Sequence, residues 1–272
     1  MKENYLTTEN FERFLKEHFF NKGPNLRSLA LSGWEFFDPY SLVFLLLLAR
    51  HSGIEFSLGD QNPALHYLAQ IGFFDVIARP SGPRHSPTNA DILLKITPIE
   101  RTQDLTDALK RLLSSTATIL REHLSYTSED TSLFLGAFTE VAQNIVDHSG
   151  DRGLATAQVY TTKKGSRFAA IAVGDLGIGI RSSLSQRYPK QFANDVIAIR
   201  KAFDPAVSRL ANRGWGLTQV RSITEKYNGT LWVRSCQGLV KFHRQFSSYQ
   251  THHFPGTQIS IYLEERTAKK FY

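Results

Sequence analysis

The fold is decided by the stretch Val173-Gly174-Asp175-Leu176-Gly177-Ile178-Gly179. It continues the apolar run 168–173, which predicts a buried central strand. The strand delivers Asp175 at its carboxyl end, where α/β sheets tend to place ligands. The glycines that follow let the backbone turn sharply and approach a flat ligand closely. A D-x-G-x-G string also arises by chance in chains of this size, so its meaning depends on the rest of the sequence.

A helix predicted over 133–147 precedes this strand. Glu140 and Asn144 are four residues apart and share one helix face, which Asp147 and His148 extend by a turn. A carboxylate and an amide oxygen on one face suit a hydrated Mg²⁺, which takes hard oxygen ligands, or a water polarised by the carboxylate. The alternative to a functional site is that this helix end is simply exposed to solvent.

A glycine loop, Arg213-Gly214-Trp215-Gly216-Leu217, opens directly into a helix predicted over 217–227. Free backbone N–H groups and the helix macrodipole together form an anion site, and phosphate is the usual occupant. The alternative is a loop whose glycines serve turn geometry alone. Further along the chain, Gly256-Thr257 precedes the last predicted strand, 258–263. A threonine at such a position is common in strands and has no special meaning by itself.

Taken together in this order, the motifs resemble those of the GHKL ATPases. This Bergerat-fold superfamily contains the ATP domains of histidine kinases, gyrase B, Hsp90 and MutL, and the anti-sigma serine kinases. The stretch 139–149 (TEVAQNIVDHS) looks like its N-box, 173–180 like its G1 box and 213–217 like its G2 box. The resemblance covers about residues 92–264. One departure is Trp215, where many members have a small residue or leucine.

The resemblance implies a role for each matching residue. Asp175 would accept a hydrogen bond from the exocyclic amine of adenine, and Gly177 and Gly179 would shape the adenine pocket. Asn144 and Glu140 would lie at the Mg²⁺ position, where Glu140 would orient or activate the attacking water. The other residues expected to contact the nucleotide are Asp147, His148, Arg213, Gly214, Trp215, Gly216, Leu217 and Thr257.

The stretch 180–212 would be the ATP lid of such a domain. Its cations offer counter-charge to a triphosphate, and they are Arg181, Arg187, Lys190, Arg200, Lys201 and Arg209.

The order of predicted elements in this part of the chain defines the fold class. Strands are predicted over 92–99, 154–161, 168–173, 230–235, 239–246 and 258–263, and helices over 103–124, 133–147, 195–202 and 217–227. Helices that come first and a β-meander that comes last predict an α/β sandwich, a mixed sheet with helices on one face.

A second, smaller α/β domain is expected before it. Three prolines and a glycine within 79–89 cannot sustain a helix or a central strand, so we place a linker at 79–91, between domains 1–78 and 92–272. In the first domain, strands are predicted over 26–31 and 54–58 and helices over 39–51 and 62–71, which implies one layer of helices on a sheet.

The first domain resembles, over about 24–78, the STAS fold of anti-sigma-factor antagonists. The matching features are the first strand, the Phe37-Asp38 entry into a leucine-rich helix and the Ile71-Gly72-Phe73 finish. Regulatory members carry a phosphorylatable Ser or Thr directly after the aspartate. This chain has Pro39 there, and Ser41 is a weak substitute. A small α/β domain without that ancestry is the alternative.

The composition excludes several classes of protein. With 32 Lys and Arg against 25 Asp and Glu the net charge is +7, but the basic residues are scattered, so we expect no nucleic-acid partner. A single cysteine, Cys236, excludes a disulfide framework and a cysteine-rich metal site. The first residues lack a signal-peptide core, and the longest apolar run, 42–49, is too short to span a bilayer. We therefore expect a cytoplasmic protein without membrane contact.

These observations predict a regulatory protein that binds ATP and Mg²⁺, hydrolyses ATP slowly and couples its nucleotide state to a protein partner through the STAS-like domain. Glu140 favours hydrolysis, because a carboxylate at the metal position is superfluous for binding alone. A serine/threonine protein kinase of the anti-sigma type and a non-hydrolysing ATP switch are the alternatives. Self-phosphorylation at His123 is not expected, because a single helix stands between the linker and the N-box. A homodimer is left open.

Overall fold

The computed structural model describes residues 4–23, 25–77, 92–149, 152–161, 165–205, 207 and 216–266. The predicted linker at 79–91 lies outside the described residues. Within these ranges no helix is long and apolar enough to cross a membrane.

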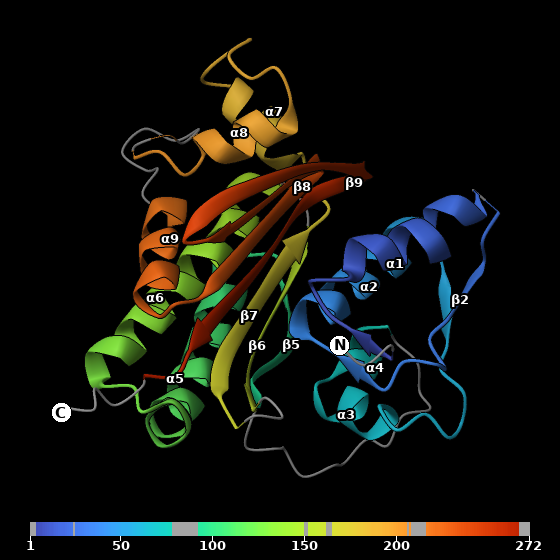
Figure 1. The fold of residues 1–272 in the computed structure, drawn as a ribbon, viewed down its shortest axis with the longest axis horizontal. Coiled ribbons are helices and arrows are strands. Elements are labelled where there is room, and N and C mark those ends of the chain that lie inside the picture. The colour runs from blue at the N-terminus through green and yellow to red at the C-terminus, as the bar shows by residue number, and fades with distance from the viewer. Residues whose placement is uncertain are drawn as a thin grey trace.

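A five-stranded sheet forms the centre of the molecule (Figure 1). Its strands, in spatial order, are β5 (Ile92–Ile99), β6 (Gly153–Thr161), β7 (Arg167–Asp175), β9 (Gln245–Glu264) and β8 (Thr230–His243). The predicted α/β class is confirmed, but the sheet is antiparallel at every pairing and not mixed. The physical reason is that β7 and β8, which do run parallel, are separated by β9, so they share no hydrogen bonds.

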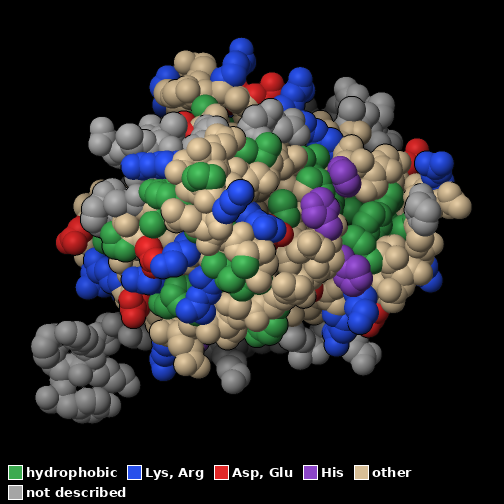
Figure 2. Space-filling model, turned by 90° about the horizontal axis from the view of Figure 1, so that it is seen from above, with side chains coloured by type: hydrophobic (Ala, Val, Ile, Leu, Met, Phe, Trp, Pro, Cys, Tyr) green, Lys and Arg blue, Asp and Glu red, His purple; other side chains and the backbone are tan. Residues whose placement is uncertain are grey.

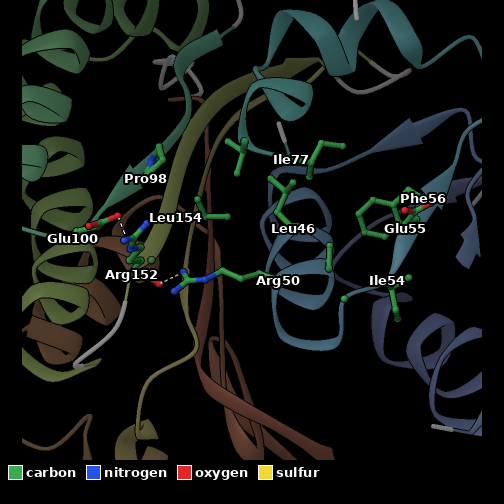
Figure 3. A pocket seen from close by; sticks show the side chains of 14 residues that line it. Leu46, Arg50, Ile54, Glu55, Phe56, Ile77, Pro98, Glu100, Arg152 and Leu154 are labelled. Atoms are coloured by element: carbon green, nitrogen blue, oxygen red, sulfur yellow. Dashed lines mark hydrogen bonds and ion pairs between the residues drawn. The ribbon is translucent and has the colours of Figure 1, made fainter. Parts of the chain in front are cut away.

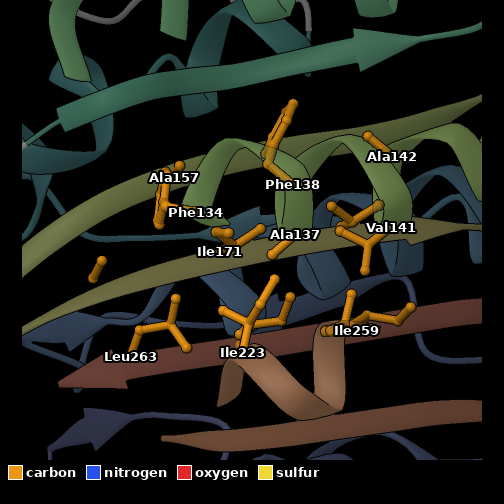
Figure 4. Close-up of a cluster of buried hydrophobic side chains, with 14 of the residues drawn as sticks. Phe134, Ala137, Phe138, Val141, Ala142, Ala157, Ile171, Ile223, Ile259 and Leu263 are labelled. Atoms are coloured by element: carbon orange, nitrogen blue, oxygen red, sulfur yellow. The ribbon is translucent and has the colours of Figure 1, made fainter. Parts of the chain in front are cut away.

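Three helices cover one face of this sheet, namely α5 (Thr102–Leu124), α6 (Ser128–Asn144) and α9 (Gly216–Lys226). Alternate strand residues point toward them, so that Ile171 of β7 and Ile259 of β9 share one buried cluster with Phe138 and Val141 of α6 (Figure 4). This cluster is the main core of the molecule, and it holds α6 and α9 against the sheet and against each other.

Helix α6 begins five residues before the predicted start at Leu133. The reason is a capping box, in which Thr127 accepts a hydrogen bond from Asp130 N, and Asp130 accepts one from Thr127 N. The buried Asp130 carboxylate also accepts hydrogen bonds from the hydroxyl of Tyr227 and from Arg266 Nη1, the latter at 2.8 Å. Burial by itself raises the pKa of Asp130, but these hydrogen bonds outweigh it and hold the pKa below its ordinary value.

The other face of the sheet is covered by the N-terminal part of the chain. Helix α2 (Pro39–Ser52) lies directly on β6 and β7, and its leucines share a core with Ala172 and Phe254 of the sheet. As predicted, the helix is buried nearly all round, begins at the N-cap Asp38 and ends at Gly53, whose φ is 66°. Because α2 fills this face, the sheet is packed on both sides.

Two buried polar links join the N-terminal part to the sheet. Asp38 accepts hydrogen bonds from Thr8 and from the hydroxyl of Tyr262 on β9. Arg234 of β8 is 0% exposed and pairs through Nε with Glu12 Oε1 at 2.7 Å. Its other nitrogens donate to the carbonyls of His252, Cys236 and Phe254. The guanidinium group also lies 5.2 Å from the ring centroid of Phe44 on α2.

The remaining N-terminal elements are short. They are β1 (Tyr5–Leu6), α1 (Phe11–His18), the 3₁₀ turn Phe20–Lys22, β2 (Ser28–Ala30), β3 (Phe36–Phe37), β4 (Glu55–Ser57), α3 (Leu65–Gln70) and α4 (Phe73–Val76). The predicted strand–helix–strand order is present in β2, α2 and β4. The two predicted strands pair with each other as β2 and β4, and the structure adds a separate parallel pair, β1 with β3, that the prediction did not include. These strands can be as short as two or three residues because α2 packs mainly on the five-stranded sheet and not on them.

The segment after β7 forms α7 (Gly179–Ser185) and α8 (Asp195–Lys201), which lie over one end of β8 and β9 (Figure 1). Strand β8 doubles back so that its ends meet, with His243 Nδ1 2.8 Å from the Gly229 carbonyl. The bend lies at Cys236, whose φ is 50°, and at Gly238, where a Cβ atom would lie 2.8 Å from Val196 N. Helix α8 therefore packs directly against the bend of β8.

Candidate functional site

Asp175 is the last residue of β7, and its buried side chain is held by the backbone on two sides. Its Oδ1 accepts a hydrogen bond from Gly177 N at 2.8 Å and one from Thr257 N at 3.3 Å. The structure thus brings together Asp175, the first glycine after it and the threonine of the last strand, which lie up to 82 residues apart in the sequence. The orientation of this carboxylate is fixed before any ligand binds.

Two glycines near Asp175 are required by close contacts and by backbone conformation. At Gly179, φ is +76° and a Cβ atom would lie 2.6 Å from Cys236 Sγ. At Gly256, φ is +79° and a Cβ atom would lie 2.0 Å from the carbonyl oxygen of Asp175. Any larger residue at position 256 would push the β9 backbone away from the end of β7.

Ser235 of β8 is a member of this cluster that the sequence analysis did not identify. Its Oγ accepts a hydrogen bond from Ile180 N at 2.9 Å, donates to the Gly256 carbonyl at 3.1 Å and lies 3.2 Å from Thr257 Oγ1. It thereby ties the first turn of α7 to the strand that carries Thr257. No local sequence signal marks it, because it lies within an ordinary predicted strand.

Glu140 and the glycine loop also come together. A Cβ atom at Gly216, the first residue of α9, would lie 2.8 Å from Oε2 of Glu140 on α6. A carboxylate beside the first turn of a helix faces free N–H groups and the positive end of the helix dipole. The N-terminus of α9 is therefore electropositive, and Glu140 is the acidic group nearest to its first residue among the contacts that the structure describes.

The helix that carries Glu140 changes geometry at its end. Asn144 is the last α-helical residue and is half-buried, and Ile145–Ser149 form a π-helical turn. Gln143 Nε2 donates to Asp147 Oδ1 at 2.9 Å within this turn. Turns of this kind are common at functional sites. The side chain of His148 lies outside what the structure describes.

The glycine loop itself is described only from Gly216 onward, so the predicted phosphate contacts at Arg213, Gly214 and Trp215 lie outside the described residues. Leu217 is buried against the core. Thr218 Oγ1 donates to the Phe203 carbonyl at 2.9 Å, which ties the first turn of α9 to the segment after α8.

The cations of the predicted lid differ in their partners. Arg181 Nε donates to the Phe192 carbonyl at 3.1 Å, and Lys201 pairs with Asp204 at 3.0 Å. Arg200 lies over the ring of Phe246, 4.6 Å from its centroid. Lys190 has a φ of 60°, whereas Arg209 is outside the described residues. These contacts hold Arg181, Arg200 and Lys201 in local structure.

No group of three or more acidic, histidine or cysteine side chains that could hold a metal ion occurs in the described part of the chain. The oxygen donors predicted for the site are the Glu140 carboxylate and the Asn144 amide, both on α6. Such oxygens suit Mg²⁺ that keeps several waters and is shared with phosphates. The donor chemistry therefore fits a magnesium ion that arrives with a phosphate ligand.

A separate cavity of about 610 Å³ lies between α2 and the edge of the sheet (Figure 3). Leu46 of α2 and Leu154 of β6 line it on its two sides. Arg50 Nη1 donates to the Arg152 carbonyl at 2.9 Å, and Arg152 pairs with Glu100 at 2.7 Å. None of the predicted site residues lines this cavity, so it is distinct from the site at Asp175.

On the face seen from above (Figure 2), the basic side chains do not gather into one patch. Figure 2 shows Lys and Arg side chains dispersed among other residues on the face seen from above, together with a group of histidines. His252 stacks on Phe20 at 4.4 Å between ring centroids, so this histidine is part of the packing between the N-terminal part and β9.

A sheet with three helices on one face, a carboxylate fixed by backbone N–H groups at the end of a central strand, and Glu140 beside the first residue of α9 together indicate a protein of the ATPase class. Residues 129–267 match the family model of the histidine kinase-, DNA gyrase B- and HSP90-like ATPases, and the chain belongs to that family. Among solved structures, a mycobacterial sensor histidine kinase, MprB, is similar at 19% sequence identity and a TM-score of 0.32. That match covers 64% of this chain and 99% of the other. No curated protein matches the chain.

Proposed function

We propose that the protein binds Mg²⁺ and ATP in the site between Asp175 and the N-terminus of α9, and that it hydrolyses ATP slowly. The observation that carries this proposal is the Asp175 carboxylate, held by Gly177 N and Thr257 N at the end of β7. In a member of this ATPase family, a carboxylate held in this way suits recognition of the adenine amine.

Each side chain contributes a distinct interaction to this proposed reaction. Asp175 accepts the hydrogen bond from the adenine amine, and Gly256 allows β9 to close against it. Asn144 supplies an amide oxygen to Mg²⁺, which, when bound, neutralises phosphate charge. Glu140, beside Gly216, orients the attacking water and accepts its proton. The N–H groups at the start of α9 receive phosphate oxygens.

We further propose that the nucleotide state is coupled to a protein partner through the N-terminal part, for which we keep the STAS-like assignment. The support is the close packing of α2 on the strand that carries Asp175. A Cβ atom at Gly174, the residue before Asp175, would lie 2.8 Å from Leu47 Cδ1 and 3.1 Å from Val43 Cγ1. A shift at the end of β7 therefore reaches α2 directly.

The phospho-switch of STAS regulators finds no support at Ser41. Its side chain is 0% exposed, and its hydroxyl donates to backbone carbonyls, that of Asp38 at 2.8 Å. A kinase could not reach this hydroxyl without unfolding the start of α2. We therefore propose that the N-terminal part relays the nucleotide state and is not the substrate of its own ATPase domain.

The decisive experiment is incubation of the full chain with γ-labelled ATP and Mg²⁺. Label that leaves as free phosphate supports hydrolysis, whereas label that stays on a serine or threonine of an added protein identifies a kinase. Bound ATP without either outcome identifies a non-hydrolysing switch. Glu140→Gln should lower phosphate release by about 10²-fold or more. Glu122→Gln, on the exposed side of α5, is the matched control and should behave as the wild type.

A further inference from the structure

Gln258 of β9 contacts the backbone of Asp175 and is 0% exposed. Its Nε2 donates two hydrogen bonds, one to the carbonyl of Asp175 and one to the carbonyl of Pro255, each at 2.9 Å. Both acceptors are carbonyl oxygens, which can only accept, so the orientation of the amide group is fixed by its partners. A single side chain thus joins the end of β7 to the approach of β9.

The two carbonyls belong to the two backbone segments that hold the Asp175 carboxylate. Pro255 leads into Gly256 and Thr257, and Thr257 N donates to Asp175 Oδ1. The contact between Gly256 and the Asp175 carbonyl leaves no room for a side chain. The amide of Gln258 thus bonds to the backbone on both sides of this contact, and losing these hydrogen bonds would free the backbone that carries the Asp175 carboxylate.

The glutamine occupies this position at a cost. Its Oε1 is buried and has no hydrogen-bond partner among the described residues. Burying an unpaired polar atom is unfavourable, and an apolar residue of the same size would avoid it. Packing alone therefore does not account for a glutamine here, whereas its two donated hydrogen bonds do.

We propose that Gln258 is a positioning residue for adenine recognition. Its two N–H bonds set the backbone at Asp175 and thereby the direction of the carboxylate that receives the adenine amine. Its stem also packs on Gly174 of β7, the residue that faces α2, where a Cβ atom would lie 3.2 Å from Gln258 Cγ and 2.8 Å from Leu47 Cδ1. The proposal rests on the proposed function, since it concerns the same nucleotide site.

Gln258→Met tests this, because it keeps the length of the side chain and removes both donors. The matched control is Gln158→Met on β6. Gln158 is 2% exposed, faces the N-terminal part and also has a buried atom without a partner, Nε2. Calorimetry on the full chain measures the affinity for ATP and, as a probe of the phosphate subsite alone, for inorganic triphosphate.

We expect Gln258→Met to lower ATP affinity about tenfold and to leave triphosphate affinity unchanged. Gln158→Met should lose stability but keep the wild-type affinity for ATP. Unchanged ATP affinity in Gln258→Met, or an equal loss for ATP and triphosphate, would overturn the positioning role. Should Gln258→Met fail to fold, Gln258→Asn takes its place, because it draws the amide back by one methylene and loses the same contacts. A wild type that binds triphosphate but not ATP would instead refute the proposed function itself.

Discussion

Arg234→Met should destabilise the whole molecule, because Arg234 joins α1, α2 and the β8–β9 hairpin from a fully buried position. Methionine keeps much of the aliphatic stem but removes the guanidinium group, which lies 5.2 Å from the ring centroid of Phe44 and 5.7 Å from that of Phe254. It removes the ion pair with Glu12 and the hydrogen bonds to three backbone carbonyls. The variant therefore isolates the polar contribution of this side chain.

The expected loss of unfolding free energy follows from the burial of Arg234 and Glu12. Removing one member of a buried ion pair costs about 3–5 kcal/mol, because the other charge is left without its partner. The Glu12 side chain is 28% exposed and can regain water, so the lower end applies, about 3 kcal/mol. For a domain of this size that corresponds to a fall in melting temperature of about 6–12 °C.

Urea unfolding followed by circular dichroism measures this free energy. The control is Lys241→Met, which removes an ion pair between the same strand and Glu9 at 2.8 Å, but one exposed to solvent, and should cost less than about 1 kcal/mol. A loss below about 1 kcal/mol in Arg234→Met, equal to the control, would refute the view that the N-terminal part and the sheet form one cooperative structure.

Further expectations concern the site and its support. Glu140→Gln should still bind ATP with Mg²⁺ while steady-state phosphate release falls by about 10²-fold or more, and release at the wild-type rate would place the water-activating group elsewhere. Asn144→Ala should weaken nucleotide binding in the presence of Mg²⁺ and change it little without the ion, as calorimetry in both conditions would show. Gly216→Val forces a side chain against Glu140 and should lower ATP affinity much more than adenosine affinity; an equal loss for both would assign the loop to the base pocket. Because the pKa of Asp130 is lower in the folded than in the unfolded chain, its contribution is present above about pH 4 and is lost as the pH falls through the folded value. Asp130→Asn should therefore flatten the dependence of unfolding free energy on pH in that acidic range.

The sequence predicts well those elements whose signals are local. The apolar run ending at Asp175, the strand 92–99 and the helix that begins at Pro39 all have strong periodicity or capping residues, and each is present in the structure. The start of α6 was placed too late, because the capping box at Thr127 and Asp130 precedes the apolar residues on which the prediction relied. The motif residues Glu140 and Gly216 are expected in one site, which stays a prediction; in the structure a Cβ atom at Gly216 would lie 2.8 Å from Glu140 Oε2.

What the sequence could not supply are contacts between residues far apart in the chain. The pairing of Arg234 with Glu12 and of Tyr262 with Asp38 depends on how α2 lies on the sheet, which no local pattern encodes. Ser235 and Gln258 stand in strands where their residue types are unremarkable. The sequence predicts an antiparallel β-meander at the end of the chain, but it does not predict the strand order, because the insertion of β9 between β7 and β8 is a matter of topology and not of composition.

The central claim, that Asp175 selects adenine in a nucleotide site, is tested most directly by calorimetry with ATP and GTP on the wild type and on Asp175→Asn. Guanine presents an acceptor where adenine has an amine, so it would face the carboxylate with two acceptors opposed. The wild type should bind ATP far more tightly than GTP, and Asp175→Asn should lose most of this preference. Equal affinity of the folded wild type for the two nucleotides would contradict the assignment of Asp175 and, with it, the proposed site.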